Sequence, residues 1–198
     1  MYRFIESIKL KEGLFCNLEY HQKRVNETLR KYYPGAEINL FQISIPRAFV
    51  NGLFKTRIVY SDIINQIDFI PYKIRSINKL QIIESNDVDY SFKYQNRETL
   101  DEIFSKRGLC DDVIISKFGM ITDTSYSNIV LYDEKNYYTP KNPLLKGTKR
   151  QYLIDNHVIK EKEIYVNQIK EYSKIYLINS MINLGDVELM ITNENICY

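Results

Sequence analysis

Short runs of β-branched and aromatic residues, separated by polar turns, alternate irregularly with a few segments of helical spacing along this chain. The runs typical of strands span residues 4–10, 14–18, 55–60, 63–70, 74–83, 112–116, 129–132, 137–139, 174–179 and 187–191. The segments with helical spacing are residues 18–32, 98–107 and 148–156. Because strands and helices follow no strict strand–helix–strand order, the pattern predicts an α+β fold in two lobes.

The polar cluster Ser85-Asn86-Asp87 lies between an extended run and a new pattern, and it marks the expected boundary between the lobes. The 198 residues are 44% hydrophobic, which is enough for one large domain or for two small ones around hydrophobic cores. We therefore expect a small N-terminal α/β lobe at residues 1–86 and a larger C-terminal lobe at residues 87–198.

Composition sets further bounds on the class of protein. A formal net charge of +2 gives no electrostatic reason to expect nucleic-acid binding. No apolar run approaches the roughly 20 residues needed to span a bilayer, and an acidic residue within the first six argues against a signal peptide, so a cytoplasmic location is the default expectation. Cys16, Cys110 and Cys197 fit buried thiols in a reducing compartment. Neither His21 nor His157 lies beside a cluster of suitable ligands, so no metal site is expected.

Lys93 is a candidate for covalent chemistry because Phe92 and Tyr94 flank it. Aromatic neighbours would desolvate the amine and favour its neutral, nucleophilic form. Composition alone does not single it out, since Lys and Arg total 27 residues and most such side chains lie on solvated faces.

Three segments could hold an anion. Leu145-Lys146-Gly147-Thr148 opens a predicted helix, where free N–H groups and the helix dipole suit a phosphate, although an ordinary N-cap explains the same residues. Asn179-Ser180-Met181 follows a hydrophobic strand and could present N–H groups too, or be a plain turn. His21 and Arg24 form a His-x-x-Arg pair on the first predicted helix, where the arginine could fork onto a phosphate or make a salt bridge.

With the carboxylate of Asp123, these segments supply an amine, an acid and an anion-binding helix start. Pyridoxal phosphate (PLP) needs such groups for its aldehyde, its pyridine nitrogen and its phosphate. The sequence contains no P-loop, no Gly-x-Gly-x-x-Gly and no Gly-x-Ser-x-Gly motif.

Taken in order, these segments resemble the fold-type IV PLP enzymes, the family of class IV aminotransferases and 4-amino-4-deoxychorismate lyases. The resemblance runs from Phe4 to about Gly185 and implies a D-amino-acid aminotransferase-like fold with a barrel-like sheet in the C-terminal lobe. It also implies a homodimer with sites near the interface and a small-molecule amino substrate. Its motifs are His21-x-x-Arg24, Lys93-x-x-Asn96-Arg97, Thr122-Asp123-x-x-x-x-Asn128, Gly147-Thr148-Lys149-Arg150 and the turn at Ser180-Met181.

The same resemblance implies a role for individual residues. Lys93 forms the Schiff base with PLP, Arg24 binds its phosphate, and Asp123 faces its pyridine nitrogen. The other residues implied in cofactor binding are Tyr126, the backbone N–H groups of Thr148 and Lys149, and the turn residues Ser180 and Met181. Arg57, Arg97 and Tyr126 are candidates for substrate carboxylate or ring contacts, with salt bridges and packing as the alternative.

Three departures from the family pattern concern the pyridine contact and the substrate side. Asp123 replaces the usual Glu and is one methylene shorter, so it would need a local backbone shift or a bridging water to reach the nitrogen. The chain begins at what looks like the family's second segment, so a usual first strand and loop are expected to be missing. The middle of the first lobe is short, and a Gly-Arg-Gly loop found in some lyases is absent after Arg57.

The resemblance implies that Lys93 acts as the general base and that Asp123 keeps the pyridine nitrogen protonated. Two reactions then remain open. Elimination would release pyruvate and 4-aminobenzoate, a step of folate biosynthesis, whereas reprotonation would transfer the amino group of a branched-chain or D-amino acid to a 2-oxo acid. The motifs at Lys93–Arg97 and Asn179–Met181 favour the lyase. A third alternative is a protein that binds PLP without turnover.

Overall fold

The computed structural model describes residues 2–198, and Met1 lies outside the described residues. The chain forms two compact units, the first made of Met1–Ile74 with Phe92–Asn96 and the second of Arg75–Ser91 with Arg97–Tyr198. This division differs from the expected boundary at residue 86. The physical reason is that strand β5 (Leu80–Glu84), which precedes residue 86, pairs with strand β6 (Asp112–Lys117) of the second unit.

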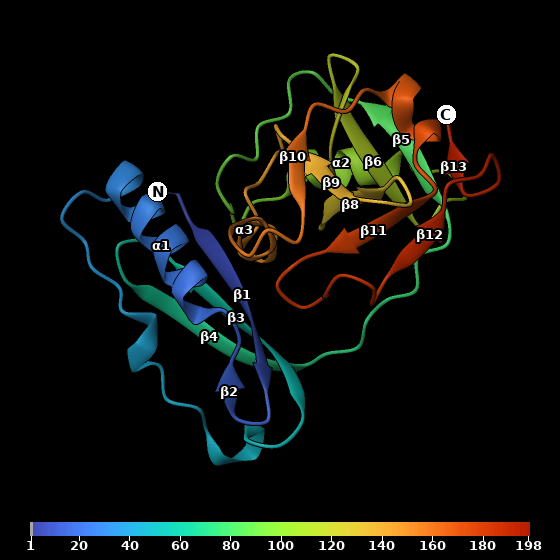
Figure 1. The fold of residues 1–198 in the computed structure, drawn as a ribbon. Helices are drawn as coiled ribbons and strands as arrows, with labels where there is room; N and C mark the ends of the chain where they lie inside the picture. Colours follow the sequence, from blue (N-terminus) through green and yellow to red (C-terminus); the bar gives the residue numbers. More distant parts are fainter. Residues whose placement is uncertain (1) are drawn as a thin grey trace. The chain divides into compact units, whose positions relative to one another are not determined.

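The first unit is an antiparallel sheet in the order β2-β1-β3-β4 with one long helix (Figure 1). Its elements are β1 (Phe4–Lys11), β2 (Leu14–Phe15), α1 (Leu18–Tyr32), the short 3-10 helices η1 (Leu40–Gln42) and η2 (Arg47–Phe49), β3 (Leu53–Tyr60) and β4 (Ile64–Pro71). The buried residues of α1 are His21, Val25, Thr28 and Leu29, and their spacing forms one face. Val25 and Leu29 pack with Phe4 and Ile8 of β1, so this face of the helix covers the sheet.

The segment Phe92–Asn96 returns to the first unit and extends the edge of β1. The Ile5 N–H donates to the Lys93 carbonyl at 2.9 Å, and the Gln95 N–H donates to the Arg3 carbonyl at 2.8 Å. Phe92 and Tyr94 pack against the core of this unit. The candidate lysine therefore belongs to the first unit, although the expected boundary at residue 86 would put it in the C-terminal lobe.

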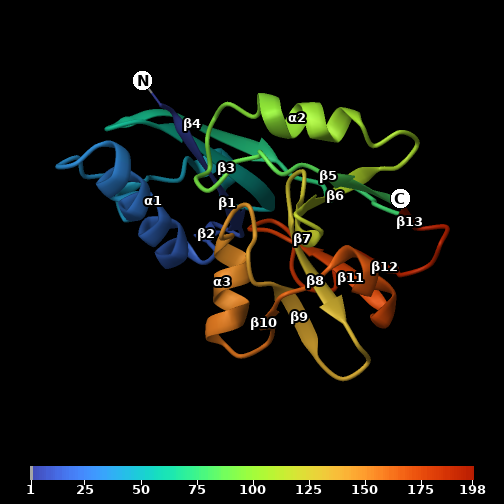
Figure 2. The same ribbon diagram turned by 90° about the horizontal axis from the view of Figure 1, so that it is seen from above.

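In the described residues of the second unit, strands are hydrogen-bonded in the order β10-β9-β8-β7-β6-β5-β13, and β11 pairs with both β8 and β12. Its elements are β5, α2 (Glu98–Ser105), β6, β7 (Met120–Thr124), β8 (Asn128–Tyr132), β9 (Tyr137–Pro140), α3 (Thr148–Asp155), β10 (Lys160–Lys162), η3 (Val166–Glu171), β11 (Lys174–Ile178), β12 (Glu188–Met190) and β13 (Ile196–Cys197). The sheet mixes parallel pairs, such as β5 with β6, and antiparallel pairs, such as β6 with β7. Helix α2 lies beside β6 (Figure 2).

The α+β class is confirmed, and the predicted helices begin at the expected residues Leu18, Glu98 and Thr148. Strands β7, β10 and β13 were not predicted, because β7 is rich in polar residues and the other two are only three and two residues long. Across residues 2–198, no helix combines the length and the apolar character needed to cross a membrane.

The cysteines are free thiols, but the prediction that all are buried is wrong for Cys16 and Cys197, which are half-buried. Only Cys110 is buried, and burial is the main reason why its pKa rises to about 11. The described residues contain no cluster of three or more His, Cys, Asp or Glu side chains that could hold a metal ion.

Candidate active site

In the first unit, the His-x-x-Arg pair of α1 converges on one carboxylate of β1. Arg24 donates from Nε to Oε1 of Glu6 at 2.8 Å and from Nη2 to Oε2 at 2.5 Å. The His21 Nδ1 lies 2.6 Å from the same Oε2. Glu6 and His21 are both 0% exposed. Arg24 therefore binds the buried Glu6 carboxylate through one edge of its guanidinium group. Two parallel charged hydrogen bonds of this bidentate kind are strong.

The partners of Glu6 decide its ionisation. Burial alone would raise the pKa of Glu6, but the charge of Arg24 and the hydrogen bonds from His21 and Arg24 lower it to about 2. Burial lowers the pKa of His21, and the positive charges of Arg24 and Lys93 act in the same direction. At neutral pH the Glu6 carboxylate is therefore ionised and the His21 ring is neutral. Because a carboxylate can only accept, the neutral ring donates its Nδ1 proton to Glu6.

Lys93 is half-buried and lies at the centre of a tight turn in which the Tyr94 N–H donates to the Phe92 carbonyl at 2.8 Å. The rings of Phe92 and Tyr94 lie 6.4 Å and 5.4 Å from the ring of Phe4. From the sequence, these aromatic neighbours are expected to desolvate the Lys93 amine. In the structure their contacts anchor the segment to the core of the first unit.

In the second unit, Asp123 lies near the end of β7 and is 4% exposed. Its Oδ1 accepts a hydrogen bond from Asn128 Nδ2 at 2.7 Å, and its Oδ2 accepts one from the Leu145 N–H at 2.9 Å. Burial raises the pKa of Asp123 to about 6, against the opposing effect of the Leu145 and Asn128 hydrogen bonds. The donors at hydrogen-bond distance are neutral amides, so the carboxylate can still gain from a cationic partner.

Asn128 joins the acid to the predicted phosphate turn. Its Nδ2 also donates to the Leu145 carbonyl at 2.8 Å, so one side-chain amide holds both Asp123 and the turn. A Cβ atom built on Gly147 would lie 2.0 Å from the Asn128 Oδ1. Gly147 has φ −67°, so the glycine is needed for this close approach and not for a left-handed backbone. The sequence shows Asn128 only as one position of a motif and does not indicate its role, since its partner Leu145 is distant in the chain.

Helix α3 begins at Thr148, and its N-cap residue, Gly147, has no side chain that could cap the first turn. Thr148, Lys149 and Arg150 of its first turn are buried. The Lys149 Nζ donates to the Asn183 Oδ1 at 3.0 Å, which ties this helix start to the turn after β11. A helix start whose N-cap residue is a glycine leaves the backbone N–H groups of its first turn accessible to an anion in type and direction.

The turn at Ser180-Met181 is held by Asn179, whose Oδ1 accepts the N–H groups of Met181 at 2.8 Å and Ile182 at 3.0 Å. The Met181 N–H, a predicted phosphate donor, is thus already bonded within its turn. A phosphate contact at this N–H requires the Asn179 side chain to give way.

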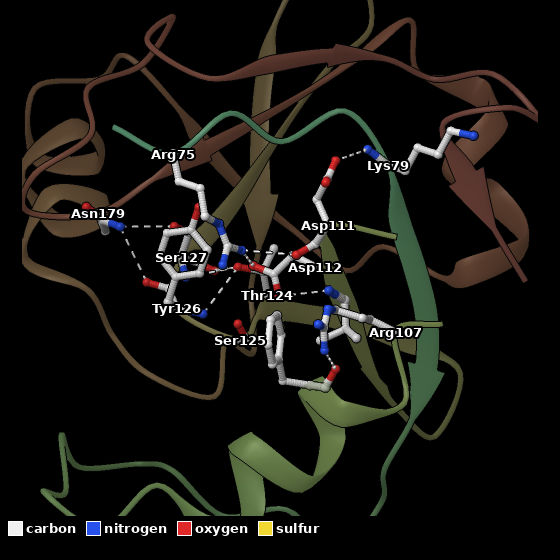
Figure 3. A network of polar contacts seen from close by, with 12 residues as sticks. Arg75, Lys79, Arg107, Asp111, Asp112, Thr124, Ser125, Tyr126, Ser127 and Asn179 are labelled. Carbon is white, nitrogen blue, oxygen red and sulfur yellow. Dashed lines mark hydrogen bonds and ion pairs between the residues drawn. The ribbon is translucent and has the colours of Figure 1, made fainter. Parts of the chain in front are cut away.

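The loop between β7 and β8 is fixed by a polar network (Figure 3). The Arg75 guanidinium lies 5.1 Å from the ring centre of Tyr126, and its Nη2 lies 3.6 Å from Oδ2 of the buried Asp112. Asn179 Nδ2 donates to the Ser127 Oγ at 3.0 Å. The structure therefore places Tyr126, a predicted cofactor contact, on a loop whose conformation is set by its neighbours.

Two predicted substrate residues make contacts of their own. Arg97 donates from Nη2 to the Ser125 carbonyl at 2.8 Å, so it supports the same loop. Arg57 forms an ion pair with Asp68 across β3 and β4 at 3.7 Å. The Arg57–Asp68 pair is a salt bridge of the kind that the sequence left open as the alternative, and Arg97 forms one as well, with Asp101 at 3.7 Å.

The residues present fit PLP in chemical type. Asp123 is a buried acid with neutral donors, suited to a protonated ring nitrogen, and the first turn of α3 has the features of a phosphate cradle. In the first unit, Arg24 and Lys93 supply a guanidinium group and an amine near the same histidine.

Comparison with known proteins agrees with this chemistry. Residues 78–189 match the class IV amino-transferase family. An uncharacterised protein of Haemophilus influenzae is 33% identical over 185 residues, which cover 91% of this chain and 98% of that protein. The crystal structure of a candidate 4-amino-4-deoxychorismate lyase from Haemophilus somnus matches with a TM-score of 0.82 at 27% identity, covering 93% of this chain and 98% of that chain.

The PLP-bound form of a hypothetical aminotransferase from Mycobacterium tuberculosis has a TM-score of 0.71 at 16% identity and covers 92% of this chain and 79% of that chain, which shows a shared fold. The chain therefore belongs to the class IV aminotransferase family and has the fold of the fold-type IV PLP enzymes. This is a family of PLP-dependent lyases and transaminases.

Proposed function

We propose that this protein is a PLP-dependent 4-amino-4-deoxychorismate lyase, which eliminates pyruvate from aminodeoxychorismate and leaves 4-aminobenzoate for folate biosynthesis. The observation that carries PLP use is the Asp123–Asn128–Gly147 arrangement, in which one amide holds a buried acid against the turn that opens α3. The choice of the lyase is supported by the Lys93-x-x-Asn96-Arg97 motif and by the similarity to the Haemophilus somnus protein.

In this proposal Asp123 accepts a hydrogen bond from the protonated ring nitrogen. Its raised pKa reflects a carboxylate that burial penalises, and a cation at hydrogen-bond distance would relieve that penalty. When bound, PLP supplies a ring that accepts the electron pair left on the substrate carbon. Asn128 keeps the Asp123 side chain in place, because its amide also bonds the Leu145 carbonyl.

The remaining roles are assigned by chemical type. The ε-amine of Lys93 would hold the cofactor covalently, and as a free amine it would take the proton from the amine-bearing carbon of the substrate. The guanidinium of Arg24 and the N–H groups of Thr148, Lys149, Ser180 and Met181 bind the phosphate. Tyr126 contacts the cofactor ring, and Arg57 and Arg97 contact the substrate. We also propose that the protein acts as a cytoplasmic homodimer on a small amino substrate.

The test starts with the absorbance spectrum of the purified protein. Wild type is expected to be yellow with PLP, and Lys93→Ala is expected to lose that band, while Lys135→Ala, at an exposed lysine, keeps it. Aminodeoxychorismate added to wild type should then release pyruvate without any 2-oxo acid.

Each other outcome identifies a different function. An obligatory need for a 2-oxo acid, with conversion of the bound cofactor to its amine form by an amino acid alone, would identify a transaminase. Cofactor binding with neither reaction would identify a PLP-binding protein without turnover. No PLP band in wild type would reject PLP use altogether.

A further inference from the structure

Glu6 is a charged residue at a position where the alternation of β1 calls for an apolar one. Its neighbours on the same face, Phe4 and Ile8, are 0% exposed and belong to the core cluster, and Glu6 is 0% exposed as well. A buried ion pair is weak evidence for stability, because well-packed apolar residues often stabilise a fold equally well or better. Stability alone therefore does not explain a carboxylate at this position.

The geometry suggests orientation as its purpose. The two Glu6 oxygens meet Nε and Nη2 of Arg24, so the carboxylate fixes the plane of the guanidinium group as well as its position. His21 Nδ1 lies 2.6 Å from Oε2 and holds the carboxylate from a second direction. The Arg24 side chain is 12% exposed while Glu6 is fully buried, so Glu6 binds the guanidinium group from the side of the core.

We propose that Glu6, braced by His21, is a positioning residue that orients Arg24 for contact with the phosphate of the cofactor. This inference rests on the proposed function, in which Arg24 is a phosphate ligand. Loss of Glu6 should change the affinity for phosphate in opposite directions, depending on whether Glu6 orients Arg24 or only compensates its charge. Without the Glu6 anion, Arg24 carries more uncompensated positive charge, which by itself would strengthen phosphate binding. If the anion instead orients the guanidinium, its loss weakens that binding.

The experiment measures equilibrium affinity for PLP and for pyridoxal, which lacks the phosphate, in wild type, Glu6→Gln, Arg24→Gln and the double variant. Glu6→Gln is expected to bind PLP about tenfold more weakly, because an amide cannot accept both arginine hydrogen bonds, and to bind pyridoxal as wild type does. The double variant is expected to bind PLP no more weakly than Arg24→Gln, because the two residues act as one unit. Glu27→Gln, on the exposed side of α1, is the matched control and should change neither affinity.

Three results would overturn the inference: equal loss of PLP and pyridoxal affinity, tighter PLP binding in Glu6→Gln, or additive losses in the double variant. Should Glu6→Gln fail to fold, Glu6→Asp keeps the charge and withdraws the carboxylate by one methylene. It is expected to lower the preference for PLP over pyridoxal, and an unchanged preference would reject the orienting role. Failure of the proposed function shows up separately, as a wild-type protein without the Lys93-dependent absorbance band.

Discussion

Each of the two units buries one carboxylate with a proposed role, and the pKa values of these two carboxylates are shifted in opposite directions. Glu6 meets a guanidinium and an imidazole, and its pKa falls to about 2. Asp123 meets the amides of Asn128 and Leu145, and burial raises its pKa to about 6. Burial is similar in both, so the charge of the hydrogen-bonded partners decides the direction, and the charge of Arg150, which makes no hydrogen bond to Asp123, does not outweigh burial there. An acid already paired is suited to hold an arginine, and an acid with only neutral donors is suited to receive a cation.

The largest expected effect is on the pH dependence of stability and comes from Glu6, the acid paired with Arg24. The pKa of Glu6 lies below its ordinary value of 4.5, so the pair stabilises the folded state above about pH 4.5 and loses that contribution as the pH falls toward 2. The shift corresponds to about 3 kcal/mol. Urea unfolding of the apoprotein between pH 2 and pH 6 should show this loss in wild type and not in Glu6→Gln. Parallel pH profiles for the two proteins would contradict it.

Gly147→Ala tests how Asp123, the acid bonded only to neutral amides, is held in place. The added Cβ would lie 2.0 Å from the Asn128 Oδ1 and displace the amide that holds Asp123. We expect a loss of about 2 kcal/mol in the free energy of unfolding, from overpacking and a broken hydrogen bond. Adding Asn128→Ala removes the clashing atom, so the double variant should be more stable than the sum of the single effects predicts. Simple additivity would argue against this contact.

Asp123 should also set the pH dependence of cofactor binding. Below about pH 6 Asp123 takes up a proton, and a neutral carboxyl group no longer attracts a protonated ring nitrogen. PLP affinity of wild type should therefore fall by about tenfold for each pH unit below this point. Titrations of Asp123→Asn should give weaker binding without a midpoint near 6. A midpoint retained in that variant would assign the titration to another group.

The smallest effect on stability is expected from the partly exposed ion pair of Arg57 and Asp68. Arg57 and Asp68 are about one-third exposed and 3.7 Å apart, so Arg57→Ala should change the free energy of unfolding by about 0.5 kcal/mol or less. If Arg57 also contacts the substrate, as proposed, the variant should raise KM while the change in stability stays within this range. An unaltered KM would remove Arg57 from the site.

Local patterns were enough to predict the helices and most strands, because apolar spacing and turn residues act within a few positions of each other. The alternation of residues 4–10 predicted β1 correctly, but it could not show that Glu6 meets side chains 15 and 18 positions away. Asn128 and Gly147 likewise lie in separate motifs that the sequence treats as independent. What remained hidden were pairings between distant segments, which depend on how the chain folds back on itself.

The return of Phe92–Asn96 to the edge of β1 has a consequence for any attempt to dissect the protein. The chain passes from one unit to the other after Ile74, after Ser91 and again after Asn96. A fragment cut at any one peptide bond would lack a strand or an edge segment that the other piece retains. The halves of this protein are therefore interleaved in sequence, and neither could be exchanged or inherited as a single uninterrupted block.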